Sequence, residues 1–125
     1  LHLVKPLGFD MDDAKLRRAG LDYHDLAHVM VHESLDDALA QVPGRVWALT
    51  GHASAMYSDV SYADGDGLLF GRESVGLSEE AMSHPRVEKR IRIHMREGVR
   101  SLNLANSASI VLYEAWRQLG FPGGV

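Results

Sequence analysis

The chain contains no cysteine. This excludes disulfide bonds, thiolate metal ligands and a cysteine nucleophile, and it suits a reducing compartment. No apolar run approaches the roughly 20 residues that a membrane-spanning helix requires, and no signal peptide is visible. We therefore expect a cytoplasmic protein that does not associate with membranes.

The chain also has no large excess of either positive or negative charge. The 13 Lys and Arg against 17 Asp and Glu give a formal net charge of −4. This balance argues against bulk electrostatic capture of nucleic acid, although a local basic face remains possible because net charge does not report distribution. With 46% hydrophobic and 24% charged residues in 125 positions, the composition is that of a globular protein, and we expect a single domain over residues 1–125.

Apolar runs and helix signals alternate along the chain. Ser34 with Asp37 three residues later predicts one helix start, and Ser78 before two glutamates predicts another. The expected strands cover 1–4, 27–31, 45–50, 68–71 and 90–95, and the expected helices cover 11–19, 35–40, 79–84 and 103–119. This alternation predicts an α/β fold, a mostly parallel sheet with helices on both faces.

Two of the predicted strands run into loops of glycine and small polar residues. Gly71 and Gly76 bracket Glu73 after one strand, and five Ser and Asn residues lie between Ser101 and Ser109 after the other. Because parallel sheets bind ligands at the carboxyl ends of their strands, these loops predict a small-molecule site. No Lys-Ser or Lys-Thr follows Gly76, which argues against nucleoside triphosphate binding.

Each pattern also has a purely structural interpretation. The glycines suit a tight turn with positive φ, and helix capping accounts for one or two of the small polar residues. The histidines at 24, 28 and 32 have the spacing of metal ligands on a helix, but the segment between them is strand-like and supplies no further ligand. We interpret them as surface residues and expect no metal.

Four separated segments carry a family resemblance. Residues 68–77 (LLFGRESVGL) and the pair 91–95 (IRIHM) and 101–117 (SLNLANSASIVLYEAWR) resemble the second and third motifs of the SPOUT methyltransferases. Residues 5–24 and 60–65 resemble one branch of that superfamily, the small bacterial tRNA (cytidine/uridine-34) 2′-O-methyltransferases. The resemblance extends over essentially the whole chain.

This resemblance implies an α/β domain whose C-terminal segment forms a trefoil knot, with S-adenosylmethionine bound in the knot and a homodimer as the working unit. It implies a reaction in which the ribose 2′-hydroxyl of the tRNA wobble nucleotide attacks the methyl group. Carried over position by position, the cofactor contacts are Leu49, Thr50, Gly71, Glu73, Gly76, Ile93, Met95, Ser101, Leu102 and Asn103.

The resemblance also implies roles on the substrate side. Ser101 and Asn103 are candidate catalytic groups, while the main catalytic Arg of related enzymes belongs to an Asn-x-Gly-x-x-Arg motif expected upstream of Leu1. Contacts with the anticodon stem-loop fall on Arg17, Arg18, Arg100 and Tyr113. One departure is His94, which stands where the family usually has proline.

Two other functions remain open from the sequence. The chain could be a non-catalytic RNA- or cofactor-binding module of the same fold, because the first motif is absent from the residues given. It could also be a 2′-O-methyltransferase that acts on a different RNA, such as ribosomal RNA.

Overall fold

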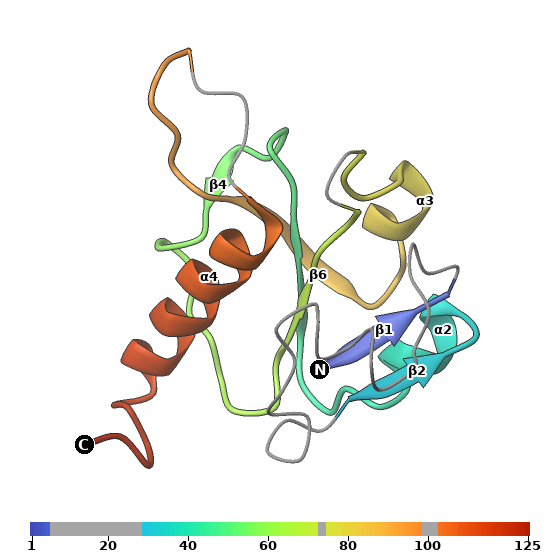
Figure 1. Ribbon diagram of the computed structural model, residues 1–125, viewed down its shortest axis with the longest axis horizontal. Helices are drawn as coiled ribbons and strands as arrows, with labels where there is room; N and C mark the ends of the chain where they lie inside the picture. The colour runs from blue at the N-terminus through green and yellow to red at the C-terminus, as the bar shows by residue number, and fades with distance from the viewer. Residues whose placement is uncertain (6–28, 73–74, 99–102) are drawn as a thin grey trace, which may run out of the picture. The chain divides into compact units, whose positions relative to one another are not determined.

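The computed structural model describes residues 1–5, 29–72, 75–98 and 103–125. The chain divides into two compact units, Leu1–Gln41 and Val42–Val125 (Figure 1). The predicted helix over 11–19 and the start of the predicted strand over 27–31 lie outside the described residues. The single domain over 1–125 stays a prediction.

The described residues of the first unit form two short parallel strands and one helix. Strand β1 (His2–Val4) pairs with β2 (Met30–His32), and α2 (Leu35–Leu39) packs against both. The Ser34 hydroxyl accepts a hydrogen bond from the Asp37 amide at 3.1 Å, which is the predicted cap. Ala38 and Leu39 are the buried residues of this helix, so its apolar contribution is small.

The second unit is built on a four-stranded parallel sheet in the order β4-β6-β3-β5. These strands are β3 (Val46–Leu49), β4 (Ala55–Met56), β5 (Gly67–Leu69) and β6 (Val87–Arg92). All four residues of β3 are buried, as expected for a central parallel strand whose two faces are both covered. The predicted parallel α/β arrangement is confirmed.

Two helices accompany this sheet, α3 (Glu79–Met82) and α4 (Leu104–Gln118). Ser78 caps α3 and Asn103 caps α4, as capping rules predict for these residue types. Val111 of α4 is fully buried in one core cluster with Trp47, Leu49, Tyr62 and Ile91. The long helix is therefore held by apolar packing on the face of β3 that presents Trp47 and Leu49.

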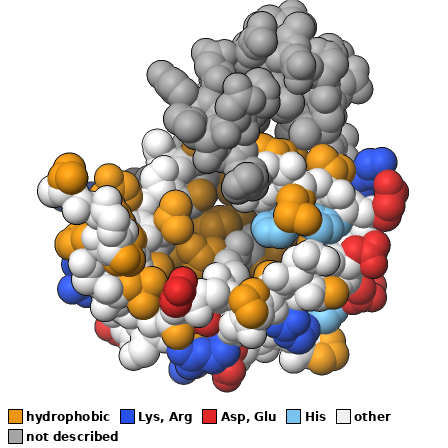
Figure 2. Space-filling model, turned by 90° about the horizontal axis from the view of Figure 1, so that it is seen from below, with side chains coloured by type: hydrophobic (Ala, Val, Ile, Leu, Met, Phe, Trp, Pro, Cys, Tyr) orange, Lys and Arg blue, Asp and Glu red, His pale blue; other side chains and the backbone are white. Residues whose placement is uncertain are grey.

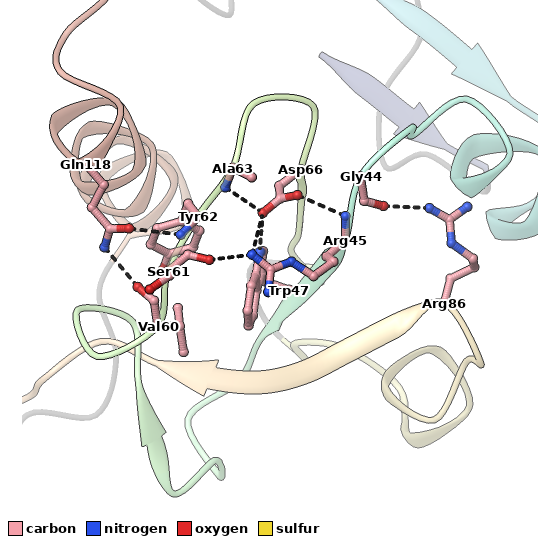
Figure 3. Close-up of polar contacts among 10 residues, drawn as sticks. All are labelled: Gly44, Arg45, Trp47, Val60, Ser61, Tyr62, Ala63, Asp66, Arg86 and Gln118. Carbon is pink, nitrogen blue, oxygen red and sulfur yellow. Dashed lines mark hydrogen bonds and ion pairs between the residues drawn. The ribbon is translucent and has the colours of Figure 1, made fainter.

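A buried carboxylate organises the loop before β5 (Figure 3). Asp66, with a 6% exposed side chain, accepts hydrogen bonds from Trp47 Nε1 at 3.0 Å and from the backbone amides of Ala63 and Arg45 at 2.9 Å. Burial alone would raise the pKa of Asp66, but the hydrogen bonds outweigh that effect and lower it. The carboxylate thereby fixes a loop that has no regular structure of its own.

Two predicted boundaries need correction. The strand expected over 90–95 is β6, which starts at Val87 and ends at Arg92, because pairing with β3 begins at Val46 and Val87. The sequence predictions place no strand or helix in the segment 51–67, yet it contains β4, which pairs with the end of β6. Both differences come from tertiary pairing that local sequence does not encode.

None of the helices in the described part of the chain combines the length and apolar character needed to cross a bilayer. The knot implied by the family resemblance stays a prediction.

We predict that Asp66→Asn lowers the free energy of unfolding by about 2 kcal/mol at pH 7, because the amide group loses charge-assisted hydrogen bonds and turns an N–H toward other donors. The lowered pKa of Asp66 means that this stabilisation is fully present above about pH 4 and is lost as the pH falls through the folded-state pKa. Chemical denaturation should therefore show a gap between wild type and variant that narrows below pH 4.

Asp64→Asn is the matched control, because Asp64 is an exposed carboxylate on the same loop, and it should change stability little. A gap that is equally wide at pH 7 and in strong acid would contradict this account of Asp66.

Candidate functional site

A cavity of about 310 Å³ lies in the second unit where three parallel strands end. This volume falls at the lower end of the range for small-molecule sites. Residues from the ends of β3, β5 and β6 meet there with the first turns of α4. The lining consists of Leu49, Thr50, Gly51, His52, Phe70, Gly71, Arg72, Val75, Gly76, Leu77, Arg92, Ile93, Met95, Leu104 and Ser107.

The turn after β3 forms the first wall. The Thr50 amide donates to the Ile91 carbonyl at 3.0 Å, which extends the pairing with β6 by one residue. The Thr50 hydroxyl then accepts from the His52 amide at 3.3 Å. Such a hydroxyl-to-backbone turn fixes the chain direction at the point where the strand ends.

The glycine loop after β5 forms the second wall. The Gly76 amide donates to the Arg72 carbonyl at 2.7 Å, and Gly76 has φ +70°, a region that glycine enters without strain. A Cβ on Gly71 would collide with the backbone of Gly76 and Leu77. The loop therefore closes so tightly on itself that Gly71 has no room for a side chain.

The segment after β6 forms the third wall. Its backbone is tied to the end of β4, because the Tyr57 amide donates to the Arg92 carbonyl at 2.8 Å. The ring of His94 packs edge-to-face against Tyr57, with ring centroids 6.0 Å apart. The family resemblance implies a proline at position 94. Here the contact between His94 and Tyr57 restrains the segment instead of a pyrrolidine ring.

The start of α4 closes the cavity. The side-chain oxygen of Asn103 accepts from the amides of Ala105 at 2.8 Å and Asn106 at 3.3 Å. These bonds satisfy backbone donors that a helix leaves without partners in its first turn. The Asn103 oxygen therefore has a structural task at the edge of the site, and its predicted contact with a ligand stays a prediction.

The lining combines apolar side chains with two arginines, Arg72 and Arg92. Leu49, Phe70, Leu77 and Ile93 contribute apolar surface, while the charged side chains among the described lining residues are arginines, with no Asp or Glu. Such a cavity suits a ligand with a flat apolar part and a negatively charged end. In the described ranges no group of three or more His, Asp or Glu side chains could hold a metal ion.

Six of the residues predicted to contact the cofactor line this one cavity: Leu49, Thr50, Gly71, Gly76, Ile93 and Met95. Glu73, Ser101 and Leu102 lie outside the described residues. The sequence reasoning missed Phe70, Leu104, Ser107 and Arg92, which line the same space. Phe70 precedes Gly71 and Arg92 precedes Ile93 in the sequence. Their position at the strand ends could therefore have identified both as lining residues.

The residues predicted to bind RNA are mostly not described. Arg17, Arg18 and Arg100 lie outside the described ranges, whereas Tyr113 is 62% exposed on α4 and packs edge-to-face on Trp116. Figure 2 shows acidic and basic side chains interspersed over the described residues on the face that it presents.

The model of the SpoU rRNA methylase family matches residues 1–113. The chain belongs to this family. A relative in Methylovorus glucosotrophus, named tRNA (cytidine(34)-2′-O)-methyltransferase, is 49% identical over 126 residues, which cover 100% of this chain and 82% of the relative. The resemblance to SPOUT methyltransferases is thereby confirmed.

Solved structures of SpoU-type enzymes agree with this membership. One, described as giving structural insights into the 2-OH methylation of C/U34 on tRNA, aligns with a TM-score of 0.86 at 42% identity, covering 96% of this chain and 78% of that one. Another, an AdoMet-bound rRNA methyltransferase from Sinorhizobium meliloti, aligns with a TM-score of 0.72 at 26% identity, covering 94% and 45%.

We predict that Gly71→Ala lowers the free energy of unfolding by about 1–3 kcal/mol, because the added methyl group must push the backbone of Gly76 and Leu77 apart. Gly51→Ala is the control, since Gly51 lines the same cavity and a Cβ there meets nothing within 4 Å. Denaturant titration of the two variants measures the difference. Equal stability of the two would show that the loop opens without cost.

Proposed function

We propose that this protein transfers the methyl group of S-adenosylmethionine to the ribose 2′-hydroxyl of nucleotide 34, a cytidine or uridine, in tRNA. The observation that carries this proposal is the 49% identity, over the whole of this chain, to a relative named for that activity. The cavity at the carboxyl ends of β3, β5 and β6 supports it, because most of the described residues expected to contact the cofactor meet there.

The cavity fits the cofactor in size and chemistry. Its volume of about 310 Å³ is in the range of small-molecule sites, and its apolar walls suit an adenine ring. The AdoMet-bound relative has the same fold. In this proposal, backbone groups of Leu49, Gly71 and Ile93 hold the nucleoside, and Thr50, Gly76 and Met95 complete the walls, with Glu73, Ser101 and Leu102 beside them. The cofactor supplies an electrophilic methyl group on a sulfonium ion.

The contribution of the protein is to position the ribose hydroxyl and to exclude water. A neutral hydroxyl is a poor nucleophile, so catalysis requires its oxygen to be aligned with the methyl group and its proton to be accepted. Ser101 and Asn103 are our candidates on the substrate side. We assign recognition of the anticodon stem-loop to Arg17, Arg18, Arg100 and Tyr113, no metal to the reaction, and the cytoplasm as the location where tRNA is modified.

We also infer that the C-terminal segment is knotted. Gln118 of α4 accepts from the Tyr62 amide and donates to the Val60 carbonyl, both at 2.9 Å. The end of the helix is thereby tied to a loop more than 50 residues earlier in the chain (Figure 3). The contact shows that α4 returns to an earlier part of the chain. The knot itself is what the family resemblance implies, and the alignment with the solved structure on C/U34 methylation supports it.

A homodimer completes the proposal. Near its C-terminal end, α4 and the residues after it expose several large apolar side chains: Leu112 at 61%, Tyr113 at 62%, Leu119 at 40% and Phe121 at 44%. Apolar side chains that cluster on the surface of one helix mark interaction sites in soluble proteins. A second copy of the chain is the partner that the family resemblance implies.

We predict that Leu112→Asp weakens the dimer by about 10- to 100-fold in Kd, because a buried Leu contributes about 1.5–3 kcal/mol. Ser58→Asp places the same charge on an exposed residue outside α4 and should leave the dimer intact. Sedimentation equilibrium measures both. A wild-type protein that sediments as a monomer would overturn the proposed dimer.

We predict that the purified protein transfers label from S-adenosylmethionine to an unmodified tRNA substrate, and that a transcript with a 2′-deoxynucleotide at position 34 accepts none. The matched control differs only in the one oxygen that receives the methyl group, so loss of transfer identifies the acceptor. Transfer to ribosomal RNA with none to tRNA would contradict the proposed substrate. Normal cofactor binding without transfer to any RNA would contradict the proposed enzyme and favour a binding module.

A further inference from the structure

Arg92, the last residue of β6, presents a buried donor without a partner. Arg92 is one of the residues that line the cavity, and its Nε is buried and has no hydrogen-bond acceptor among the residues that the structure describes. Among the described residues, it is the only buried side-chain nitrogen or oxygen atom without a hydrogen-bond partner. Buried N–H groups in folded proteins are nearly always paired, so an exception at a cavity wall points to an acceptor that arrives with a ligand.

The neighbouring arginines show what a satisfied guanidinium looks like in this protein. Arg90, two residues earlier on β6, donates to the Glu79 carboxylate at 2.8 Å and to the Ser83 hydroxyl at 3.0 Å. Arg86 donates to the backbone carbonyls of Val42 and Gly44 at 2.8 and 2.9 Å (Figure 3). The Nε of Arg92 has no such acceptor among the described residues.

The backbone holds Arg92 in this position. Its strand pairs with β4 at Met56, and its carbonyl accepts from the Tyr57 amide at 2.8 Å. Because His94 packs on the ring of Tyr57, the chain is fixed on the C-terminal side of Arg92 as well. The backbone is thus fixed on both sides of Arg92, so the side chain starts from a defined position beside the cavity.

The surrounding charge favours an anion. The described residues of the cavity wall include no carboxylate, so nothing described there neutralises the guanidinium. An arginine offers a planar pair of N–H donors that matches the two oxygens of a carboxylate or a phosphate. The chemistry that the site is built to receive is therefore an oxyanion.

We propose that Arg92 binds the carboxylate of the methionine part of S-adenosylmethionine, an inference that rests on the function proposed above. A phosphate of the RNA backbone has the same charge but belongs to a bulky chain. The carboxylate of S-adenosylmethionine, in contrast, lies at the end of a slender aliphatic tail. Such a tail can enter the cavity and bring the carboxylate to Arg92. Arg92 therefore fixes the end of the cofactor opposite to the adenine and orients the tail that carries the methyl group.

The test compares two ligands that differ in one group, S-adenosylmethionine and its decarboxylated analogue, by calorimetric titration. We expect the wild-type protein to prefer the carboxylated ligand by about 10- to 100-fold, the size of one charge-assisted contact. Arg92→Gln should remove that preference by weakening the carboxylated ligand alone. Arg92→Lys should retain part of it, because the charge remains while the fork is lost.

Arg90→Gln is the matched control, since Arg90 is on the same strand and is paired with Glu79 outside the cavity. It should keep the wild-type ligand preference. An Arg92→Gln protein that retains the full preference overturns the proposal. So does a variant that loses tRNA affinity and one unit of salt dependence while binding both ligands normally, because that result assigns Arg92 to an RNA phosphate. Failure of the wild-type protein to bind either ligand would instead refute the proposed function.

Discussion

The parallel pairing of β3 with β5 and β6 is the constraint on which the rest of the second unit depends. Parallel strands direct their carboxyl ends to one edge, so the turn at Thr50, the loop around Gly71 and the segment at Ile93 meet without any further device. This arrangement requires a central strand that is buried on both faces. The apolar run Val46–Leu49 meets that requirement. The ligand cavity is a consequence of this strand order.

Polar contacts then hold the pieces that the sheet does not pair. Asp66 fixes the loop before β5 through three hydrogen bonds, and Gln118 ties the end of α4 to the loop at Val60 and Tyr62. Each side chain satisfies backbone groups that irregular segments would otherwise bury without partners. In this way the chain keeps a rigid frame behind a site assembled largely from loops.

Local sequence predicted what local physics determines. The caps at Ser34 and Ser78 are where the capping rules place them. Six of the seven described residues that the family resemblance implies as cofactor contacts line one cavity. Tertiary contacts determine the rest: β4 forms only because β6 lies beside it, and nothing near Arg92 in the sequence indicates that its Nε lacks an acceptor. The family motifs supplied the reaction, which neither periodicity nor composition encodes.

The central claim is that the cavity at the ends of β3, β5 and β6 is the site of the methyl donor. A crystal structure with S-adenosylhomocysteine tests it directly. The account predicts the nucleoside against the backbone of Leu49, Gly71 and Ile93. A ligand seated instead in a second cavity, of about 360 Å³ beside Arg45 and Lys89, would contradict it.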